Sequence, residues 1–152
     1  MKQVEINQEA KLSPHFTLGE LTVSKSHPEV YNVPSHVHIE NLKRVCVWLE
    51  ALRERYNEPI IITSGYRSAE LNRKVGGVAT SNHLTGCAVD IRVAGKEQLI
   101  RYACILLDYA DETKQEFDEL LLEHGSNGVI WLHFAVRPPT QQNRRKINFL
   151  QG

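Results

Sequence analysis

Residues 81–93, with the sequence SNHLTGCAVDIRV, contain a histidine followed by a stretch in which apolar and other side chains alternate. An alternation with a period of two predicts a β-strand over residues 87–93, with one apolar face and with Ala88, Asp90 and Arg92 on the opposite face. An ionised carboxylate on a covered sheet face needs a partner or a bound cation, because burying it alone costs several kcal/mol. Asp90 is therefore the first candidate functional residue.

The chain before this strand is predicted to be mainly helical. Apolar residues at three- and four-residue spacing predict a long amphipathic helix, a capping-box pattern at Thr17 and Glu20 predicts a short one, and a β-branched run predicts a short buried strand. The expected elements are a short helix near Leu21, a long helix after Pro34 to about Tyr56, a strand over residues 60–63 and a short helix over residues 68–75.

After the strand, one more helix and two more strands are expected. Residues 96–110 have the apolar spacing of an amphipathic helix. Residues 117–123 and 129–136 are typical of strands, and the tight glycine-containing loop between them indicates a hairpin. Helices that precede most of the strands, with little interleaving, favour an α+β fold over a doubly wound one. We therefore predict a small, mainly antiparallel sheet with helices packed on one side.

The length and composition indicate one globular domain. The chain has 152 residues, 41% of them hydrophobic and 24% charged, which is near the average for globular proteins. We expect a single domain over residues 1–152, with a loosely ordered arm at residues 1–13 and a C-terminal tail at residues 137–152.

Charge, hydropathy and cysteine content exclude several classes of protein. The 18 basic and 18 acidic residues give a formal net charge of zero, which argues against a nucleic-acid-binding protein. No apolar run approaches the roughly 20 residues of a membrane-spanning helix, so stable membrane insertion is not expected, and the first residues lack the apolar centre of a signal peptide. Three cysteines without CxxC spacing indicate reduced thiols in a protein made in the cytoplasm. A monomer is the expected state.

His83 and His133 are the candidate partners of Asp90. His133 is predicted to lie in the middle of a strand, with Trp131 and Ala135 on the same face, and His83 lies in the loop that precedes the strand of Asp90. Two histidines and one carboxylate, with a fourth position for water, are a ligand set of catalytic zinc. From the residues alone a second interpretation stays open, in which Asp90 pairs locally and His133 is a hydrogen-bonded core histidine.

Four segments of the sequence resemble the M15 metallopeptidases, a family that includes D-alanyl-D-alanine carboxypeptidases and phage endolysins. Residues 81–90 have every fixed position of its SxHxxGxAxD signature. The other three segments are the SGYRS of residues 64–68, the WLH of residues 131–133 and the FTLGEL of residues 16–21, which resembles the start of the short, endolysin-like branch. The similarity therefore runs from about Phe16 to Val136.

This resemblance implies a small α+β domain of the type shared with the hedgehog signalling domain, with one bound zinc ion. The positions that match the metal ligands of the family are His83, Asp90 and His133. Arg67 matches the arginine that contacts the substrate, where its planar fork of donors would suit a carbonyl or carboxylate group. The alternative for Arg67 is a surface arginine paired with Glu70.

Ser81 and Trp131 are expected to contact the substrate, and Ser81 would also orient His83. The alternative for Ser81 is an ordinary loop serine. The implied activity is hydrolysis of an amide bond in the stem peptides of peptidoglycan by a metal-activated water, as a D,D-carboxypeptidase or an endolysin-type peptidase. Because histidine and aspartate also bind other first-row divalent ions, the choice of zinc rests on the resemblance.

The general base is the position at which the sequence departs from the family. Several relatives have a glutamate or aspartate three residues before the last histidine ligand, and this chain has Ile130 there. Glu123, on the preceding strand, would take that role if the two strands pair and bring it beside His133; His124 is a weaker candidate. Without a base, a contribution of about 10²–10⁴-fold would be lost, leaving a very slow enzyme or a domain that only binds.

Other interpretations concern the function as a whole. One is a catalytically weak or inactive zinc domain that binds cell-wall peptide, and another is a regulatory zinc domain that binds a protein partner. A cysteine peptidase built on Cys87 is disfavoured, because the strand alternation places that thiol in the core. His36 and His38 are expected to be solvated or to cap the long helix rather than to form a second metal site.

The resemblance also suggests how the protein would reach its substrate. A protein made in the cytoplasm without a signal peptide fits a phage or prophage lysin that is released through a membrane lesion made by a partner. In the tail, Arg144, Arg145 and Lys146 would form either a basic strip that binds the wall or a solvated end, and we favour the solvated end.

Overall fold

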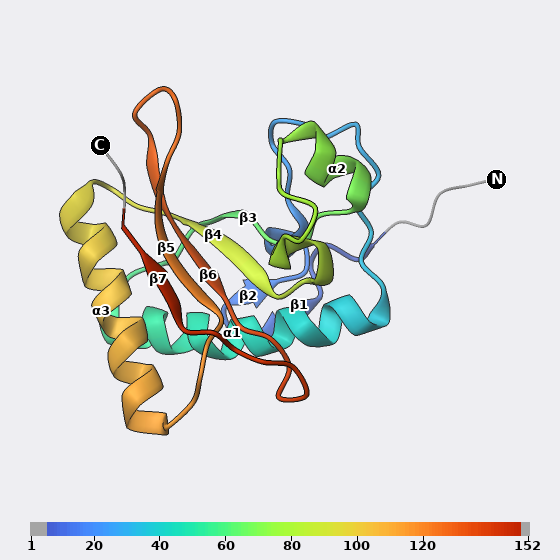
Figure 1. Ribbon diagram of the computed structural model, residues 1–152. Helices are drawn as coiled ribbons and strands as arrows, with labels where there is room; N and C mark the ends of the chain where they lie inside the picture. The colour runs from blue at the N-terminus through green and yellow to red at the C-terminus, as the bar shows by residue number, and fades with distance from the viewer. Residues whose placement is uncertain (1–5, 150–152) are drawn as a thin grey trace.

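The computed structural model describes residues 6–149, and a five-stranded sheet forms the centre of the fold (Figure 1). The strand order is β3-β4-β6-β5-β7. The strands are β3 (Ile62–Ser64), β4 (Ala88–Arg92), β5 (Glu119–His124), β6 (Ile130–Ala135) and β7 (Lys146–Asn148). Neighbouring strands are antiparallel except β5 and β7, which are parallel. The predicted α+β fold is therefore confirmed.

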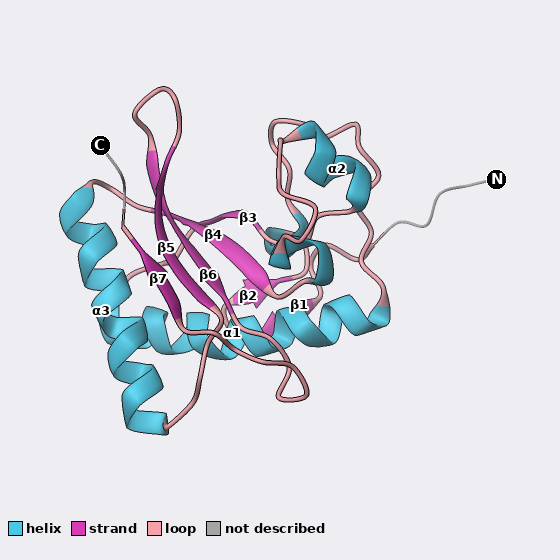
Figure 2. Ribbon diagram, in the orientation of Figure 1, coloured by secondary structure: helices cyan, strands magenta, loops and turns pink. Residues whose placement is uncertain are grey.

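Two long helices, α1 (His36–Tyr56) and α3 (Lys96–Thr113), pack against each other and cover one face of the sheet (Figure 2). Helix α1 begins at a capping box, in which the Ser35 hydroxyl accepts from the backbone N–H of His38 and the His38 ring accepts from the backbone N–H of Ser35. Both helices lie where the apolar spacing predicted them, and α3 extends past its expected end at residue 110. None of the described helices is long and apolar enough to cross a membrane.

The alternation along the strands separates an apolar core face from a polar face. On the core face, directly opposite residues of β4, β6 and β5 form two apolar rows, Val89–Phe134–Leu120 and Ile91–Leu132–Leu122. All six side chains are buried in a cluster with the apolar residues of α1 and α3. Burying one such side chain contributes roughly 1.5–3 kcal/mol. The register of the sheet is thereby fixed, because a slip by one residue would turn every apolar side chain to the other face.

The shorter predicted elements are found close to their expected positions. The capping box is confirmed, since the N–H of Thr17 donates to Glu20 Oε1 at 3.1 Å and the N–H of Glu20 donates to Thr17 Oγ1 at 3.2 Å, but the helix η1 (Glu20–Thr22) is only a 3₁₀ turn. Strand β3 begins two residues later than expected, and the short helix α2 (Ala69–Lys74) is capped by the Ser68 side chain.

The N-terminal segment is more ordered than the sequence predicted. Strand β1 (Lys11–Ser13) pairs with β2 (Phe16–Thr17) in a second, small sheet, and the carbonyl of Ala10 accepts from the N–H of Leu18. The loose arm expected at residues 1–13 is therefore wrong from Ala10 onward, and the first five residues lie outside the described part of the chain. These strands are too short to show an alternation, so no periodicity predicted them.

The C-terminal tail is also part of the fold. Strand β7 adds to the sheet beside β5, and Arg144 and Arg145 form ion pairs with Asp118 and Asp111. The end is thus ordered and paired with the fold, while residues 146–149 are exposed to solvent as expected. A free basic strip is wrong for these two arginines, because carboxylates of the protein itself neutralise both charges. A three-residue parallel strand depends on pairing between distant segments, which no local pattern predicts.

Candidate metal centre

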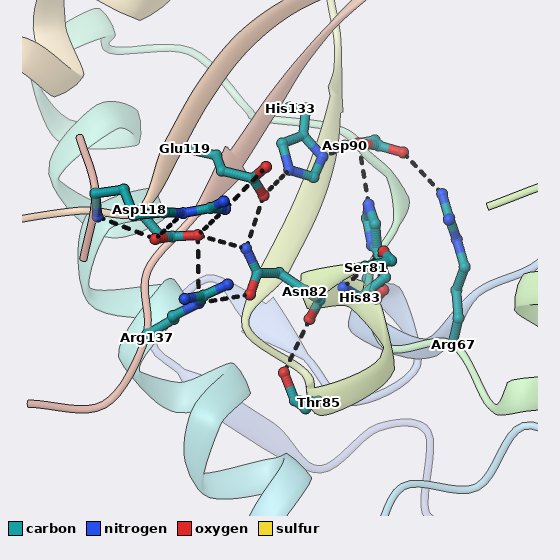
Figure 3. Close-up of polar contacts among 12 residues, drawn as sticks. Arg67, Ser81, Asn82, His83, Thr85, Asp90, Asp118, Glu119, His133 and Arg137 are labelled. Carbon is teal, nitrogen blue, oxygen red and sulfur yellow. Dashed lines mark hydrogen bonds and ion pairs between the residues drawn. The ribbon is translucent and has the colours of Figure 1, made fainter. Parts of the chain in front are cut away.

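The polar face of the sheet brings Asp90 and His133 side by side (Figure 3). Asp90 on β4 is in register with His133 on β6, and directly opposite residues have their Cβ atoms only about 4.5–5.5 Å apart on the same face. His83 approaches them from η2 (Asn82–Thr85), the 3₁₀ turn that precedes β4. One ligand atom from each of the three residues lies within 4.8 Å of those of the other two, and all three residues are buried. The structure thus assembles the three residues predicted as metal ligands.

Local contacts hold the turn that carries His83. The Ser81 hydroxyl accepts from the backbone N–H of His83 at 3.1 Å, so Ser81 caps η2 and orients His83 through the backbone. Gly86 ends the turn at a φ of +77°, where a Cβ would lie 2.6 Å from the His38 carbonyl oxygen. The Gly65 carbonyl accepts from His83 Nδ1 at 2.7 Å. The Ser81 hydroxyl, the left-handed backbone of Gly86 and the Gly65 carbonyl together place the imidazole of His83.

The hydrogen bonds of the two imidazoles leave one nitrogen of each ring directed at Asp90. Because His83 Nδ1 donates to the Gly65 carbonyl, Nε2 faces Asp90 Oδ1 at 3.3 Å. His133 Nε2 donates to Glu119 Oε1 at 3.0 Å, and Nδ1 faces the same Asp90 oxygen at 3.1 Å. The Gly65 carbonyl and the Glu119 carboxylate only accept, so the outer nitrogens carry protons. The Asp90 carboxylate also only accepts, so a bound cation would take the place of protons on the inner nitrogens. Two nitrogen lone pairs and a carboxylate oxygen that converge in this way fit zinc or another first-row divalent cation.

Burial and ion pairing shift the pKa values of this cluster. Burial alone would raise the pKa of Asp90, but the imidazoles of His83 and His133 outweigh it and hold that pKa well below its usual range. Burial alone would lower the pKa of His133, but hydrogen bonds with Asp90 and Glu119 outweigh it and raise the pKa to about 9. A proton on His133 Nδ1 would take the place of a cation, so metal binding should release a proton and strengthen as the pH rises.

Arg67 lies against the second oxygen of Asp90 rather than on the surface. Its Nη2 donates to Asp90 Oδ2 at 3.2 Å. Its Nε and Nη1 donate to Ser64 Oγ at 3.1 Å and to Asn72 Oδ1 at 3.2 Å. The alternative interpretation, a surface arginine paired with Glu70, is therefore wrong. The guanidinium orients a candidate metal ligand, and since it carries five N–H groups it keeps two for another acceptor.

Replacing Arg67 with lysine should weaken metal binding even though the positive charge is kept. A lysine ammonium is a point donor on a flexible stem and cannot reach all three acceptors at once. Losing an outer partner of a metal ligand costs roughly 10- to 100-fold in metal affinity, and we expect a loss in this range, measured by competition with a chromophoric chelator. Arg101→Lys on the exposed side of α3 is the matched control. Equal affinities of the two variants would show that the fork of donors is not needed.

Two glutamates of β5 flank the metal centre and have different surroundings. The strands pair as expected, but the residue opposite His133 is Leu121, and Glu123 is opposite Trp131. Glu119 and Glu123 therefore lie on the same strand face, one on each side of Leu121. Glu119 accepts from His133 Nε2, whereas the Glu123 carboxylate has no hydrogen-bond partner among residues 6–149. Burial raises the pKa of Glu123. Glu123 is thus close to the centre, as predicted, but the direct neighbour of His133 is Glu119.

Glu119 and Asn82 are polar residues of the site that the sequence interpretation missed. Asn82 lies between Ser81 and His83 in the signature, and Glu119 shares the strand face of Glu123. The signal for Glu119 was therefore its spacing of four residues from Glu123, which needs the strand register before it can be used.

A cavity of about 690 Å³ lies over the candidate ligands, within the usual size range of small-ligand pockets. Besides the three candidate ligands, its lining includes Arg67, Ser81, Glu119, Glu123 and Trp131. His124, the weaker candidate for the base, is exposed and lies on the other face of β5. A larger cavity of about 1290 Å³, lined in part by residues 6–9 and 27–33, contains none of these residues.

The other residues considered for chemistry have structural surroundings. Cys87 is buried, and burial raises the pKa of its thiol, which opposes the thiolate that a nucleophile needs. His38 caps α1, and His36 is exposed beside Glu40. Within the described residues, neither a cysteine peptidase nor a second metal site at the start of α1 is supported.

Comparison with known protein families gives one match. The family model described as Peptidase M15 matches residues 14–115, which is more than half of the chain. No curated protein matches the chain. The matched region contains Arg67, His83 and Asp90 and ends before β5, so His133 reaches the site from beyond it.

Proposed function

The chain belongs to the M15 peptidase family, and on this basis we propose that it is a zinc-dependent peptidase that hydrolyses an amide bond in the stem peptides of peptidoglycan. The observation that carries the proposal is the convergence of His83, Asp90 and His133 beneath a cavity of about 690 Å³. When bound there, a divalent cation supplies a positive charge that polarises a peptide carbonyl and makes water more acidic.

The other residues of the cavity would supply the remaining parts of the reaction. Glu123 would accept the proton of the attacking water and deliver it to the leaving amine, because its carboxylate is half-buried in the cavity lining and free of hydrogen bonds within the described chain. Arg67 would hold Asp90 in place and direct its remaining N–H groups at the negative charge that develops on the carbonyl oxygen. Trp131 and Ser81 would form walls for the peptide.

A second candidate function is the binding of a cell-wall peptide or a protein partner without hydrolysis. Ile130 favours it, because this side chain cannot move a proton and stands where several relatives carry a carboxylate. The two functions predict different results for a Glu123→Gln variant, since only a peptidase has turnover to lose.

We also propose that the protein is made in the cytoplasm and acts on the wall, as a monomer, after release as a phage or prophage lysin. The support for this route is the resemblance of residues 16–21 to the endolysin-like branch. Cells that express the protein should then lyse only after their membrane has been permeabilised, and lysis without permeabilisation would contradict the route.

Digestion of purified peptidoglycan tests the proposed activity. The wall is incubated with three samples: metal-free protein, zinc-loaded protein, and chelator-treated protein to which zinc has been restored. The soluble fragments are then analysed by mass spectrometry. We expect fragments with new amino and carboxyl ends only in the two samples that contain zinc, and their positions identify the bond that is cut. An intact wall in the presence of a zinc-loaded, folded protein would refute the hydrolytic function.

A further inference from the structure

A continuous chain of hydrogen bonds leads from the C-terminal segment to the metal centre (Figure 3). The backbone N–H, Nε and Nη2 of Arg144 donate to the Asp118 carboxylate. Asn82 Nδ2 donates to Asp118 Oδ2 at 2.8 Å and to Glu119 Oε1 at 2.7 Å. The same Glu119 oxygen accepts from His133 Nε2 at 3.0 Å.

We propose that Glu119 is a positioning residue that holds the ring proton of His133 on Nε2 and so presents Nδ1 to the metal, and that the side chains of Arg137 and Arg144 keep Glu119 in place through Asn82 and Asp118. The inference rests on the proposed metal centre. Glu119 acts through His133, so the role needs no contact between Glu119 and the substrate.

Asn82 can connect the two carboxylates in one orientation only. Its Oδ1 accepts from Arg137 Nε at 3.0 Å, while its Nδ2 faces Asp118 and Glu119. A rotation of the amide by half a turn would place Oδ1 against two carboxylates and Nδ2 against a guanidinium, with repulsion at both ends. The side chain is buried, so water cannot replace these partners. Arg137 therefore fixes the amide, and the amide fixes Glu119.

Asp118 anchors this chain of contacts in the sheet. It is fully buried, and it is surrounded by donors from Arg144, Asn82 and, at 3.3 Å, Arg137. Removing such donors from a buried carboxylate leaves an uncompensated charge, which is strongly destabilising. The backbone carbonyl of Asp118 also accepts from the N–H of Lys146, at the start of β7. The C-terminal segment thus supplies both the charges and the backbone contact that hold Asp118.

The contacts of Glu119 are those of an orienting group rather than of a base. Its Oε1 accepts two hydrogen bonds, and its Oε2 lies 3.5 Å from Arg144 Nη2. Carboxylates that accept from the outer N–H of a metal-ligating histidine fix its tautomer and the direction of its ring. Glu123 has no such contacts within the described residues, so the two glutamates have separate roles.

A comparison of Glu119→Leu with Glu119→Gln tests the proposal. Glutamine keeps an oxygen that can accept from His133 Nε2, whereas leucine removes the acceptor. The zinc dissociation constant, measured by competition with a chromophoric chelator, should rise about 10- to 100-fold for Glu119→Leu and by much less for Glu119→Gln. In proton NMR of the zinc-loaded proteins, the Nε2–H signal of His133 should stay downfield in the wild type and in Glu119→Gln. It should move upfield or be lost by exchange in Glu119→Leu.

Two variants at the protein surface test the contribution of the C-terminal segment. Arg144→Ala should weaken zinc binding, because Asp118 loses donors that hold it in place. Arg145→Ala is the matched control, because its partners Asp111 and Glu116 lie outside this chain of contacts, and it should leave the zinc affinity unchanged. Circular dichroism of the metal-free proteins checks the fold. If Glu119→Leu does not fold, the comparison of the zinc affinities of Arg144→Ala and Arg145→Ala tests the proposal instead.

The outcomes separate this inference from the proposed function. If Glu119→Leu folds and binds zinc with the same affinity as the wild type, the proposed role of Glu119 is overturned. Equal affinities of Arg144→Ala and Arg145→Ala would overturn the role of the C-terminal segment. A wild type that binds no zinc at all would overturn the metal centre itself, and the inference with it.

Discussion

The Asp90→Ala variant is expected to lose zinc binding and to hydrolyse wall peptide at least about 100-fold more slowly than the wild type. Asp90 Oδ1 faces both His83 and His133. Its Oδ2 accepts from Arg67. Alanine removes all of these contacts at once and leaves two histidines, fewer than the three protein ligands of a catalytic zinc site. The zinc content of the desalted protein and mass spectrometry of wall digests measure the two effects.

Control variants must separate the loss of a metal ligand from the loss of the fold. Arg67 is only 14% exposed, and breaking a buried ion pair by removing one partner costs up to roughly 3–5 kcal/mol. Asp90→Asn keeps the size and one oxygen of the side chain and should preserve more stability than alanine while still weakening zinc binding. Asp108→Ala, on the exposed surface of α3, should change neither property. Full activity in a folded Asp90→Ala protein would refute the metal-binding role of Asp90.

The positions of the candidate metal ligands on the fold could be predicted because their signals are local, whereas their role as ligands rested on the resemblance of residues 81–90 and 131–133 to the family motifs. The alternation of residues 87–93 is enough to place Asp90 on the polar face of a strand, and His133 lies in a second strand with the same kind of pattern. The spacing of Ser81 and His83 reflects a contact between the hydroxyl of one and the backbone N–H of the other. None of these inferences needs the distance between strands, so a single sequence can supply them.

The roles of the two glutamates could not be predicted, because they depend on the register of β5 and β6. Glu119 and Glu123 lie on the same strand face, and the pairing of Leu121 with His133 decides which one contacts the imidazole. A shift of the register by two residues would keep the same strand face toward the core and would place one of the two glutamates, instead of Leu121, directly opposite His133. The alternation that locates the face therefore contains no information on this choice.

The contribution of the C-terminal tail was invisible for a related reason. Arg144 pairs with Asp118, which is 26 positions away in the sequence, and β7 pairs with β5 in parallel. A cluster of basic residues near a chain end has the same local appearance whether it is solvated or paired. Only the fold shows that carboxylates of the same protein pair with Arg144 and Arg145.

The Glu123→Gln variant is expected to lower kcat by about 10²–10⁴-fold and to leave the bound zinc unchanged. Glutamine has nearly the shape of glutamate but cannot accept the proton of the attacking water. The metal should remain because Glu123 is not among the three converging ligands and contacts none of them by a hydrogen bond in residues 6–149. Wall digestion and zinc analysis measure both properties, and Glu54→Gln, at an exposed position of α1, is the matched control.

The dependence of the rate on pH distinguishes a base from a residue that only shapes the cavity. Burial raises the pKa of Glu123 above its ordinary value of 4.5. A base works in its ionised form, so the wild-type rate should rise with pH through this pKa and level off above it. The profile is measured at saturating zinc, because protons compete with the metal at His133 at low pH. The residual activity of Glu123→Gln should lack this acid limb, since an amide does not titrate. If the acid limb of the rate profile were unchanged in Glu123→Gln, the proton transfer would belong to another group. A zinc-loaded wild type that binds wall peptide without cutting it would instead be a binding domain.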